Sequence, residues 1–254
     1  MAVSFGAEGA VGTITLDKPP ADSYDIEFMR ELAGAIRAAG AADAVRVVVV
    51  RSSSEKFFSA GADVKRFLAS DLKDNMAMIR LAHEALAGVA RSPKLFVAFI
   101  AGHALGGGLE IALACDVRYA AIGRFKLGTP EVTLGLLPGN GGTQRLPRLI
   151  GAGPALELLT TGRPIGPEDA LRLGLVSEVF EDVAAFDAHV RRLAALPPLA
   201  LANIKRAVFE GVEAPLGEGL ALERDLIEQL FRSQDANEGL KAFSEKRAPE
   251  FTGA

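Results

Sequence analysis

Two segments that join an apolar run to a helix through glycine constrain this chain most. The first turn lies at Gly61, shortly before a helical pattern that begins at Val64. The second turn, Gly106 to Gly108, follows the apolar run 94–100 and precedes the apolar helical segment 109–115. Glycine allows the backbone to turn sharply and to approach another group without an intervening Cβ. The repeated order of strand, glycine turn and helix predicts a layered α/β domain whose turns gather on one side.

The rest of the chain continues this alternation and then changes character at Pro197-Pro198. Further strands are predicted at 12–16, 46–51, 117–121 and 124–127. Further helices are predicted at 25–39, 76–89, 154–161, 167–173 and 183–195, and then at 199–211, 215–233 and 237–248. We therefore predict an α/β core over residues 1–196 and a helical region over residues 197–254. The helical region is rich in Leu, Ile and Phe, which predicts packing against another subunit.

Composition excludes several classes of function. Lys and Arg number 28 against 32 Asp and Glu, so no global positive field exists to hold nucleic acid. No stretch of about 20 apolar residues lacks charges, which predicts no membrane span. Residues 1–12 show no basic segment leading into an apolar run, so we expect no secretory signal.

The metal-binding and redox residue types are few. Cys115 is the single cysteine, which excludes an intramolecular disulfide and favours a reducing, cytoplasmic setting. It lies in an apolar helical segment, as a core residue would. The three histidines His83, His103 and His189 are scattered, so we predict no metal site.

The two glycine turns have both a structural and a chemical interpretation. Each alone is typical of a tight turn or of close helix packing. Together, two helix starts on one face can aim two unpaired N–H groups at one oxygen, which stabilises an oxyanion or enolate. The segment 102–108 matches neither the dinucleotide fingerprint nor the phosphate-binding P-loop, so those two nucleotide sites are not supported.

Two carboxylates lie close to these turns in the sequence. Glu110 falls in the first turn of the helix after Gly108, and Glu131 follows Pro130 in a predicted loop. Each has a plain alternative, since Glu110 can complement a helix N-terminus and Glu131 can be a solvated acid. The apolar neighbours of Glu110 favour a functional acid. Two acids in different environments can divide the roles of base and acid.

The motifs together resemble the enoyl-CoA hydratase (crotonase) family. The segments that carry the resemblance, which follow the family's order over nearly the whole chain, are 58–63, 102–110, 130–131, 137–145, 160–163, 170–176 and 242–251. The resemblance implies a crotonase (ClpP-like) α/β fold, in which a repeated ββα spiral core precedes a C-terminal helical trimerisation region. It also implies a homotrimer or a dimer of trimers.

The resemblance also implies roles for single residues. The oxyanion hole falls on the backbone N–H groups of Ala62 and Gly107, which hold the thioester carbonyl. In family hydratases the glutamate matching Glu110 activates the water that attacks C3, and the one matching Glu131 delivers the proton to C2. The further substrate contacts are Ala60, Gly61, Asp63, Val64, Lys65, Gly108, Pro138, Gly139 and, from a neighbouring subunit, Lys246.

An acyl-CoA thioester is the substrate that the resemblance implies, with coenzyme A as part of it and no separate cofactor. Lys56, Lys65 and Arg66 flank the first turn and could meet the coenzyme A phosphates. The presence of both glutamates favours hydration of a trans-2-enoyl-CoA to a 3-hydroxyacyl-CoA. The alternatives are isomerisation, hydrolysis or C–C bond cleavage of an acyl-CoA, or acyl-CoA binding without catalysis.

One segment departs from the family's pattern. Residues 21–25 read Ala-Asp-Ser-Tyr-Asp, where the family usually has an Asn-Ala-Leu-like segment. In relatives this segment lies near the pantetheine or the floor of the active site. We therefore expect Asp22 and Tyr24 to influence which acyl group is preferred.

Overall fold

A six-stranded sheet lies at the centre of this computed structural model, which describes all residues from 1 to 254. Its strands, in spatial order, are β1 (Val3–Glu8), β2 (Val11–Leu16), β3 (Val47–Ser52), β5 (Leu95–Ile100), β7 (Val117–Ala121) and β9 (Glu178–Phe180). Strands β1 and β2 pair antiparallel, and all other neighbours pair parallel. The four consecutive valines of β3, Val47 to Val50, are all buried, as is typical of a parallel strand covered on both faces.

A second, three-stranded parallel sheet consists of β4 (Phe57–Ser59), β6 (His103–Leu105) and β8 (Leu127–Gly128). Each of these short strands directly follows a long strand of the first sheet: β4 follows β3, β6 follows β5 and β8 follows β7. A helical segment comes after each pair. This repeated ββα unit confirms the fold class that the sequence predicts.

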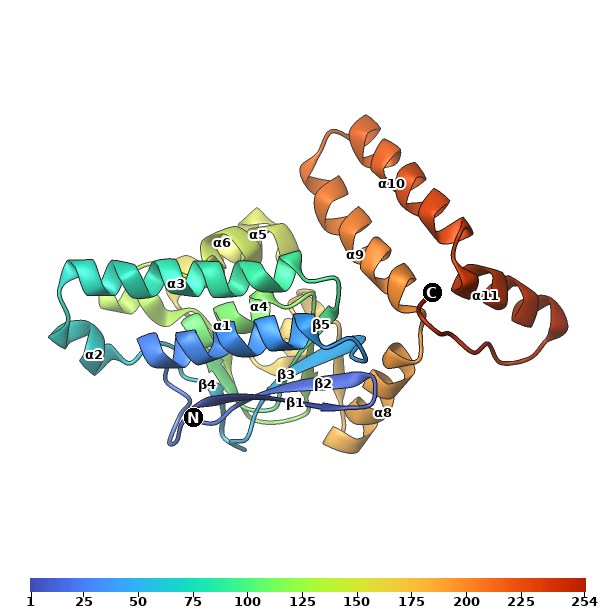
Figure 1. The fold of residues 1–254 in the computed structure, drawn as a ribbon. Coiled ribbons are helices and arrows are strands. Elements are labelled where there is room, and N and C mark those ends of the chain that lie inside the picture. The colour runs from blue at the N-terminus through green and yellow to red at the C-terminus, as the bar shows by residue number, and fades with distance from the viewer.

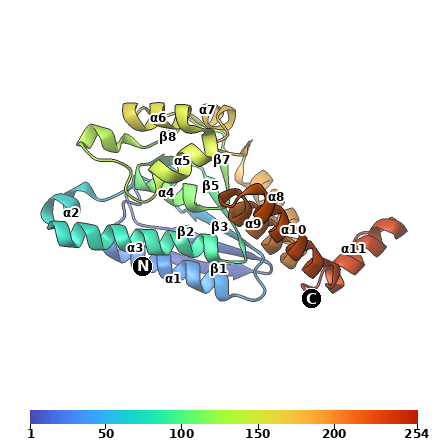
Figure 2. The ribbon, with the colours of Figure 1, turned by 90° about the horizontal axis from the view of Figure 1, so that it is seen from above.

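Helices cover both faces of the large sheet. On one face lie α1 (Ile26–Ala41) and α3 (Leu72–Arg91), side by side in Figures 1 and 2. On the other face α8 (Val183–Ala194) packs Phe186 and Val190 against Val47 and Phe99 of β3 and β5. Phe186 stacks on Phe99 with ring centroids 4.0 Å apart. The remaining helices of the core are α2 (Val64–Ala69), α4 (Gly107–Ala114), η1 (Pro130–Leu134, a 3-10 helix), α5 (Gly142–Ile150), α6 (Ala152–Thr161) and α7 (Pro167–Arg172).

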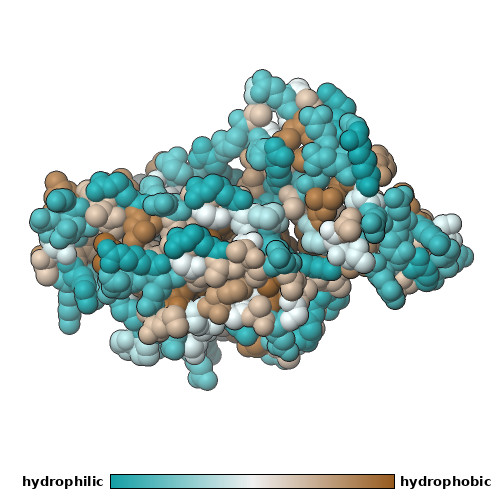
Figure 3. All heavy atoms as spheres, in the orientation of Figure 1, coloured by the Kyte–Doolittle hydropathy of each residue, from teal (hydrophilic) through white to brown (hydrophobic).

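The last three helices project away from the sheets. They are α9 (Pro198–Glu213), α10 (Leu216–Phe231) and α11 (Gln234–Glu245), and Figures 1 and 2 show them beside the core rather than over it. Large apolar side chains stay exposed on them, including Val212 at 78% and Phe231 at 65%. Figure 3 shows apolar surface among these helices. The predicted boundary falls just before α9, and a division into two domains stays a prediction.

Several predicted elements need correction. The strand expected at 124–127 is wrong for residues 124–126, because only Leu127 and Gly128 pair in β8. Strand β1 was not predicted, since it is an edge strand whose exposed residues and Gly6 weaken the apolar alternation. The sequence predicts no helix at α5, because this helix begins at a glycine and contains Pro147. Strands β4, β6 and β9 have three residues each, too few for a pattern to emerge.

None of the helices combines the length and the apolar character that crossing a bilayer requires. The location of the protein is not tested by this observation and stays a prediction. Cys115 is buried and free, and burial raises the pKa of its thiol to about 12.

Candidate active site

The first glycine turn lies at the end of β4. Gly61 has a φ of +90°, which glycine adopts without strain. A Cβ at Gly61 would lie 2.8 Å from the Leu105 oxygen and 3.3 Å from the Gly107 nitrogen. The turn therefore packs directly on the second turn, and no larger residue fits between them.

The second turn leads from β6 into α4, where Gly106 has a φ of +54°. A Cβ at Gly108 would lie only 2.2 Å from the Ser59 oxygen, so the start of α4 lies against the end of β4. The N–H groups of Ala62 and Gly107 donate to no acceptor within the protein. The two turns thus bring together two free backbone donors, at a helix N-terminus that carries a partial positive charge.

Glu110 lies in the first turn of α4, as the sequence predicts, and is 1% exposed. Its Oε1 accepts hydrogen bonds from the backbone N–H groups of Asn140 and Gly142, both at 2.7 Å. Burial raises the pKa of this carboxyl to about 7, because desolvation outweighs the two hydrogen bonds, and the nearby charge of Glu131 adds to the rise. This group can exchange a proton near neutral pH.

Glu131 lies in η1 rather than in a loop. Its Oε1 would lie 2.8 Å from a Cβ at Gly106, so the carboxylate faces the start of α4. Burial also raises the pKa of Glu131, and its Oε2 is buried without a hydrogen-bond partner. The structure therefore brings both predicted carboxylates to the N-terminus of α4, in different surroundings.

The loop between η1 and α5 carries Pro138, Gly139 and Asn140. His83 of α3 bonds through Nε2 to the Gly139 oxygen at 2.6 Å. Arg145 of α5 donates through Nη1 to the Asn140 oxygen at 2.8 Å. The loop that holds Glu110 is thus fixed from two sides. The sequence alone does not predict that His83 and Arg145 take part in the site.

The departure at residues 21–25 divides into two different roles. Asp22 is buried, and its Oδ2 accepts a hydrogen bond from Ser52 Oγ at 2.6 Å, so it braces the turn before α1. Tyr24 reaches the site, where its hydroxyl accepts a hydrogen bond from Asn140 Nδ2 at 2.6 Å. Asn140 was not singled out by sequence reasoning, although it lies in the motif 137–145. The unusual segment containing Tyr24 was the available signal.

Three buried polar side-chain atoms of these segments have no hydrogen-bond partner: Thr129 Oγ1, Glu131 Oε2 and Asn140 Oδ1. Unpaired buried polar atoms are rare in proteins and each needs an explanation. A polar ligand or water at this place would supply partners.

The other predicted contact residues lie in three places. Ala60, Gly61, Asp63, Val64, Lys65 and Gly108 lie at the two glycine turns, and Pro138 and Gly139 in the loop before α5. Asp63 caps α2, because its Oδ1 accepts hydrogen bonds from the N–H groups of Lys65 and Arg66. The Arg66 side chain pairs with Asp25 at 3.5 Å, and Lys56 lies over the Phe57 ring. The structure does not bring Lys246 to these groups, since it caps α11 in the projecting region (Figure 1).

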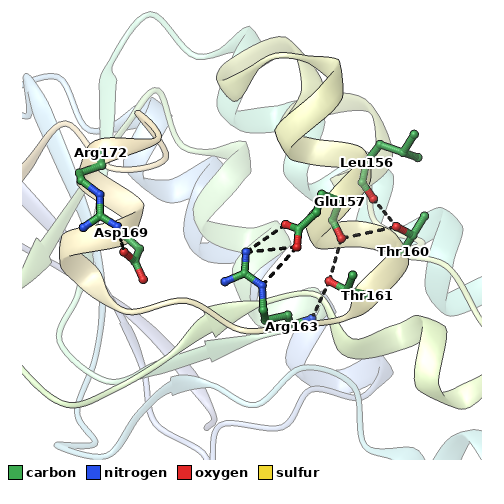
Figure 4. A network of polar contacts seen from close by, with 7 residues as sticks. All are labelled: Leu156, Glu157, Thr160, Thr161, Arg163, Asp169 and Arg172. Atoms are coloured by element: carbon green, nitrogen blue, oxygen red, sulfur yellow. Dashed lines mark hydrogen bonds and ion pairs between the residues drawn. The ribbon is translucent and has the colours of Figure 1, made fainter.

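The motif at residues 160–163 has a local structural role, shown in Figure 4. Thr160 and Thr161 donate hydroxyl bonds to carbonyl oxygens of the preceding turn, at 2.7 Å to Leu156 and Glu157 respectively. Arg163 forms a two-pronged contact with the Glu157 carboxylate at 3.0 and 3.2 Å. This cluster closes the end of α6 before the chain turns towards α7, where Arg172 pairs with Asp169.

The fold and the site define the class of this protein as a crotonase-fold enzyme. Comparison with known proteins agrees, because residues 6–254 match the model of the enoyl-CoA hydratase/isomerase family. The chain belongs to this family.

Individual relatives match over nearly the whole of this chain. A probable enoyl-CoA hydratase of Bacillus subtilis is 37% identical, with 99% of each chain covered. A methylglutaconyl-CoA hydratase from mouse mitochondria is 37% identical over 99% of this chain and 79% of its own. The crystal structure of an enoyl-CoA hydratase from Geobacillus kaustophilus has a TM-score of 0.96 and 41% identity, covering 100% of this chain and 97% of that one.

Proposed function

We propose that this protein is an enoyl-CoA hydratase, which adds water reversibly to a trans-2-enoyl-CoA to give a 3-hydroxyacyl-CoA. The observation that carries the proposal is the placement of Glu110 and Glu131 beside two unpaired backbone N–H groups. Hydration of an enoyl thioester needs a base for water, an acid for carbon and donors for the thioester oxygen. The two carboxyls of the site can serve as base and acid, and the two backbone N–H groups can serve as the donors.

In the proposed reaction the N–H groups of Ala62 and Gly107 hold the thioester oxygen, where negative charge develops as water adds. Glu110 takes a proton from the water while the oxygen of that water forms the new bond to C3. The electrons of the double bond move towards the carbonyl, and Glu131 delivers a proton to C2. One water is consumed, and the proton balance of the two carboxyls is restored through solvent.

The electrostatics of the two carboxyls support these roles. A base works best when its pKa lies near the working pH, and burial holds the pKa of Glu110 at about 7. Burial also raises the pKa of Glu131, which favours the protonated form that an acid needs. Related isomerases generally keep the glutamate matching Glu131 and vary the one matching Glu110, so the presence of both favours hydration.

The substrate end and the assembly complete the proposal. Lys56, Lys65 and Arg66 flank the first turn in the sequence, and their positive charges suit the phosphates of coenzyme A. The exposed apolar side chains of α9, α10 and α11 suit contacts between copies in a homotrimer or a dimer of trimers. Lys246, at the end of α11, would then reach a neighbour's ligand. Light scattering tests the assembly, and a purely monomeric mass would contradict it.

The activity is tested by the loss of enoyl-thioester absorbance with crotonyl-CoA and with longer enoyl-CoAs. We expect wild-type hydration, and a fall of about 10² or more in kcat for Glu110→Gln and for Glu131→Gln. Glu157→Gln is the matched control, because Glu157 is exposed and pairs only with surface groups of α6 and Arg163. Full activity in either active-site variant would refute its role. Absence of hydration at every chain length, with acyl-CoA binding intact, would favour another reaction of the family.

A further inference from the structure

We propose that Tyr24 is the positioning residue of this site, which fixes the general base Glu110 relative to the two backbone donors. The role of Glu110 as base rests on the proposed function; the contacts of Tyr24 do not. Tyr24 belongs to the segment in which the chain departs from its family. It is 3% exposed. It contacts the turn at Gly61, the start of α4 at Gly107 and the loop at Asn140.

The backbone of Tyr24 holds the first donor. Its N–H donates to the Gly61 oxygen at 2.9 Å, and its carbonyl accepts from the Asp63 N–H at 2.9 Å. These two bonds bracket Ala62 and form a parallel bridge between Ala62 and Tyr24. The bridge uses no hydrogen bond of the Ala62 N–H, which stays free.

The side chain of Tyr24 meets the second donor. A Cβ at Gly107 would lie 2.0 Å from the Tyr24 hydroxyl and 2.6 Å from two ring carbons. The hydroxyl end of the ring therefore lies directly on the Cα of Gly107. Only glycine leaves room for this contact, so the position of Tyr24 requires glycine at residue 107.

The hydroxyl of Tyr24 then reaches the base through Asn140. It accepts a hydrogen bond from Asn140 Nδ2 at 2.6 Å, and the backbone N–H of Asn140 donates to Glu110 Oε1 at 2.7 Å. Apart from Tyr24, the Asn140 side chain has no protein partner, because its Oδ1 is unpaired. The orientation of this side chain therefore depends on one hydroxyl group.

Loss of that hydroxyl should move the base while the ring still fills its space. Displacement of a catalytic group by a fraction of an ångström lowers rates by an order of magnitude or more. A weaker hydrogen bond from Asn140 also stabilises the charged form of Glu110 less. The other charged groups that influence Glu110 are Glu131 and Arg145, and the hydroxyl of Tyr24 forms its hydrogen bond with Asn140 rather than with either of them.

The test compares Tyr24→Phe with Tyr119→Phe. Tyr119 is the other tyrosine of the chain; its buried ring bonds through its hydroxyl to His189 at 3.0 Å, in the core under α8 and away from the site. We expect Tyr24→Phe to lower kcat roughly tenfold with little change in KM, and Tyr119→Phe to leave both near wild type. Asn140→Leu should lower kcat similarly, and the double variant should fall no further than either single one.

A second measurement does not depend on turnover. Titration of the Glu110 carboxyl by ¹³C NMR, assigned with Glu110→Gln, should show a pKa higher by roughly half a unit in Tyr24→Phe. An unchanged pKa of Glu110 together with an unchanged kcat would overturn the proposal, as would additive effects in the double variant. If the wild type hydrates no enoyl-CoA, the proposed function fails and the NMR titration alone decides the role of Tyr24.

Discussion

The backbone N–H of Asn140 donates to Glu110 Oε1 at 2.7 Å, and with the N–H of Gly142 it fixes this oxygen from the loop opposite α4. The second oxygen, Oε2, has no protein partner. Two hydrogen bonds normally lower a carboxyl pKa, yet here burial dominates and raises it to about 7. The site therefore holds the Glu110 carboxyl in a fixed place and in a protonation state that changes near neutral pH.

The first prediction concerns the pH dependence of hydration. Glu110 accepts a proton only when ionised, and Glu131 delivers one only when protonated, so kcat/KM of the wild type should pass through a maximum with pH. In Glu131→Gln, where Glu110 alone is left to titrate, kcat/KM should rise with pH and level off above about 7. Below that value each unit of pH should lower the rate about tenfold. Rates in saturating and limiting crotonyl-CoA between pH 5 and pH 9 measure this. The residual rate of Glu110→Gln should lack the acidic limb, while that of Glu131→Gln should keep it; an acidic limb at the pKa of an exposed glutamate would contradict the assignment.

The second prediction concerns stability, because a buried carboxyl destabilises the fold when it is ionised. The folded pKa of about 7 exceeds the ordinary value of 4.5, so the folded state binds the proton more tightly. The stability that the protonated Glu110 carboxyl contributes is fully present below about pH 4.5 and is lost as the pH rises through about 7. The change in the free energy of unfolding caused by Glu110→Gln should therefore be more favourable at pH 8 than at pH 5. The difference between the two pH values should be up to about 3 kcal/mol.

Urea unfolding of both proteins at the two pH values measures the difference. Glu157→Gln, at an exposed position, serves as the control and should show no such change with pH. An equal effect of Glu110→Gln at pH 5 and pH 8 would contradict the raised pKa.

Sequence reasoning reached the fold and the two carboxylates because those features are encoded locally. The valines of β3 predict a buried strand, and the glycines at 106–108 predict a close turn, without any tertiary information. Strands of three residues, such as β4 and β6, carry no periodicity of their own. They are defined by pairing with each other across about 45 residues, which no local pattern reveals.

The network around Glu110 was out of reach for the same reason. Asn140 became significant only when the fold placed its backbone against Glu110 and its amide against Tyr24. Asp22 and Tyr24 stood together as an unusual pair in the sequence. In the structure Asp22 bonds to Ser52 beside the turn before α1, whereas Tyr24 bonds to Asn140 at the site. The sequence does not separate these two roles.

The third prediction concerns the close approach of Gly108 to β4. A methyl group there would lie 2.2 Å from the Ser59 oxygen, and backbone at such a distance must shift. Gly108→Ala should therefore lower the free energy of unfolding by about 1–3 kcal/mol and lower hydration, since it moves the start of α4. Thermal melting and the crotonyl-CoA assay measure the two effects.

Gly34→Ala is the matched control for that substitution. Gly34 lies inside α1, and a Cβ there meets nothing within 4 Å. Alanine is the better helix former, so this variant should be more stable by about 0.5–1 kcal/mol with unchanged activity. Equal behaviour of the two variants would contradict the contact between α4 and β4.

The fourth prediction concerns the attachment of α9 to the core. Lys205 Nζ pairs with Asp116 Oδ2 at 2.8 Å, and both side chains are about 5% exposed or less. The same ammonium group donates to the carbonyl oxygens of Val89 and Lys94 at 2.8 and 3.0 Å. One buried charge from α9 thus satisfies three acceptors at the ends of α3, β5 and α4.

Lys205→Met keeps most of the side-chain volume and removes the charge, which leaves Asp116 buried without its partner. Breaking a buried pair from one side destabilises proteins by about 3–5 kcal/mol, so urea unfolding at fixed protein concentration should show a loss of this size. Arg206→Ala, at the next position, removes an exposed pair with Glu210 and should lose less than about 1 kcal/mol. If the two variants were equally stable, the ion pair would not be what holds α9 against the core, and the apolar contacts of the helix would have to carry that attachment.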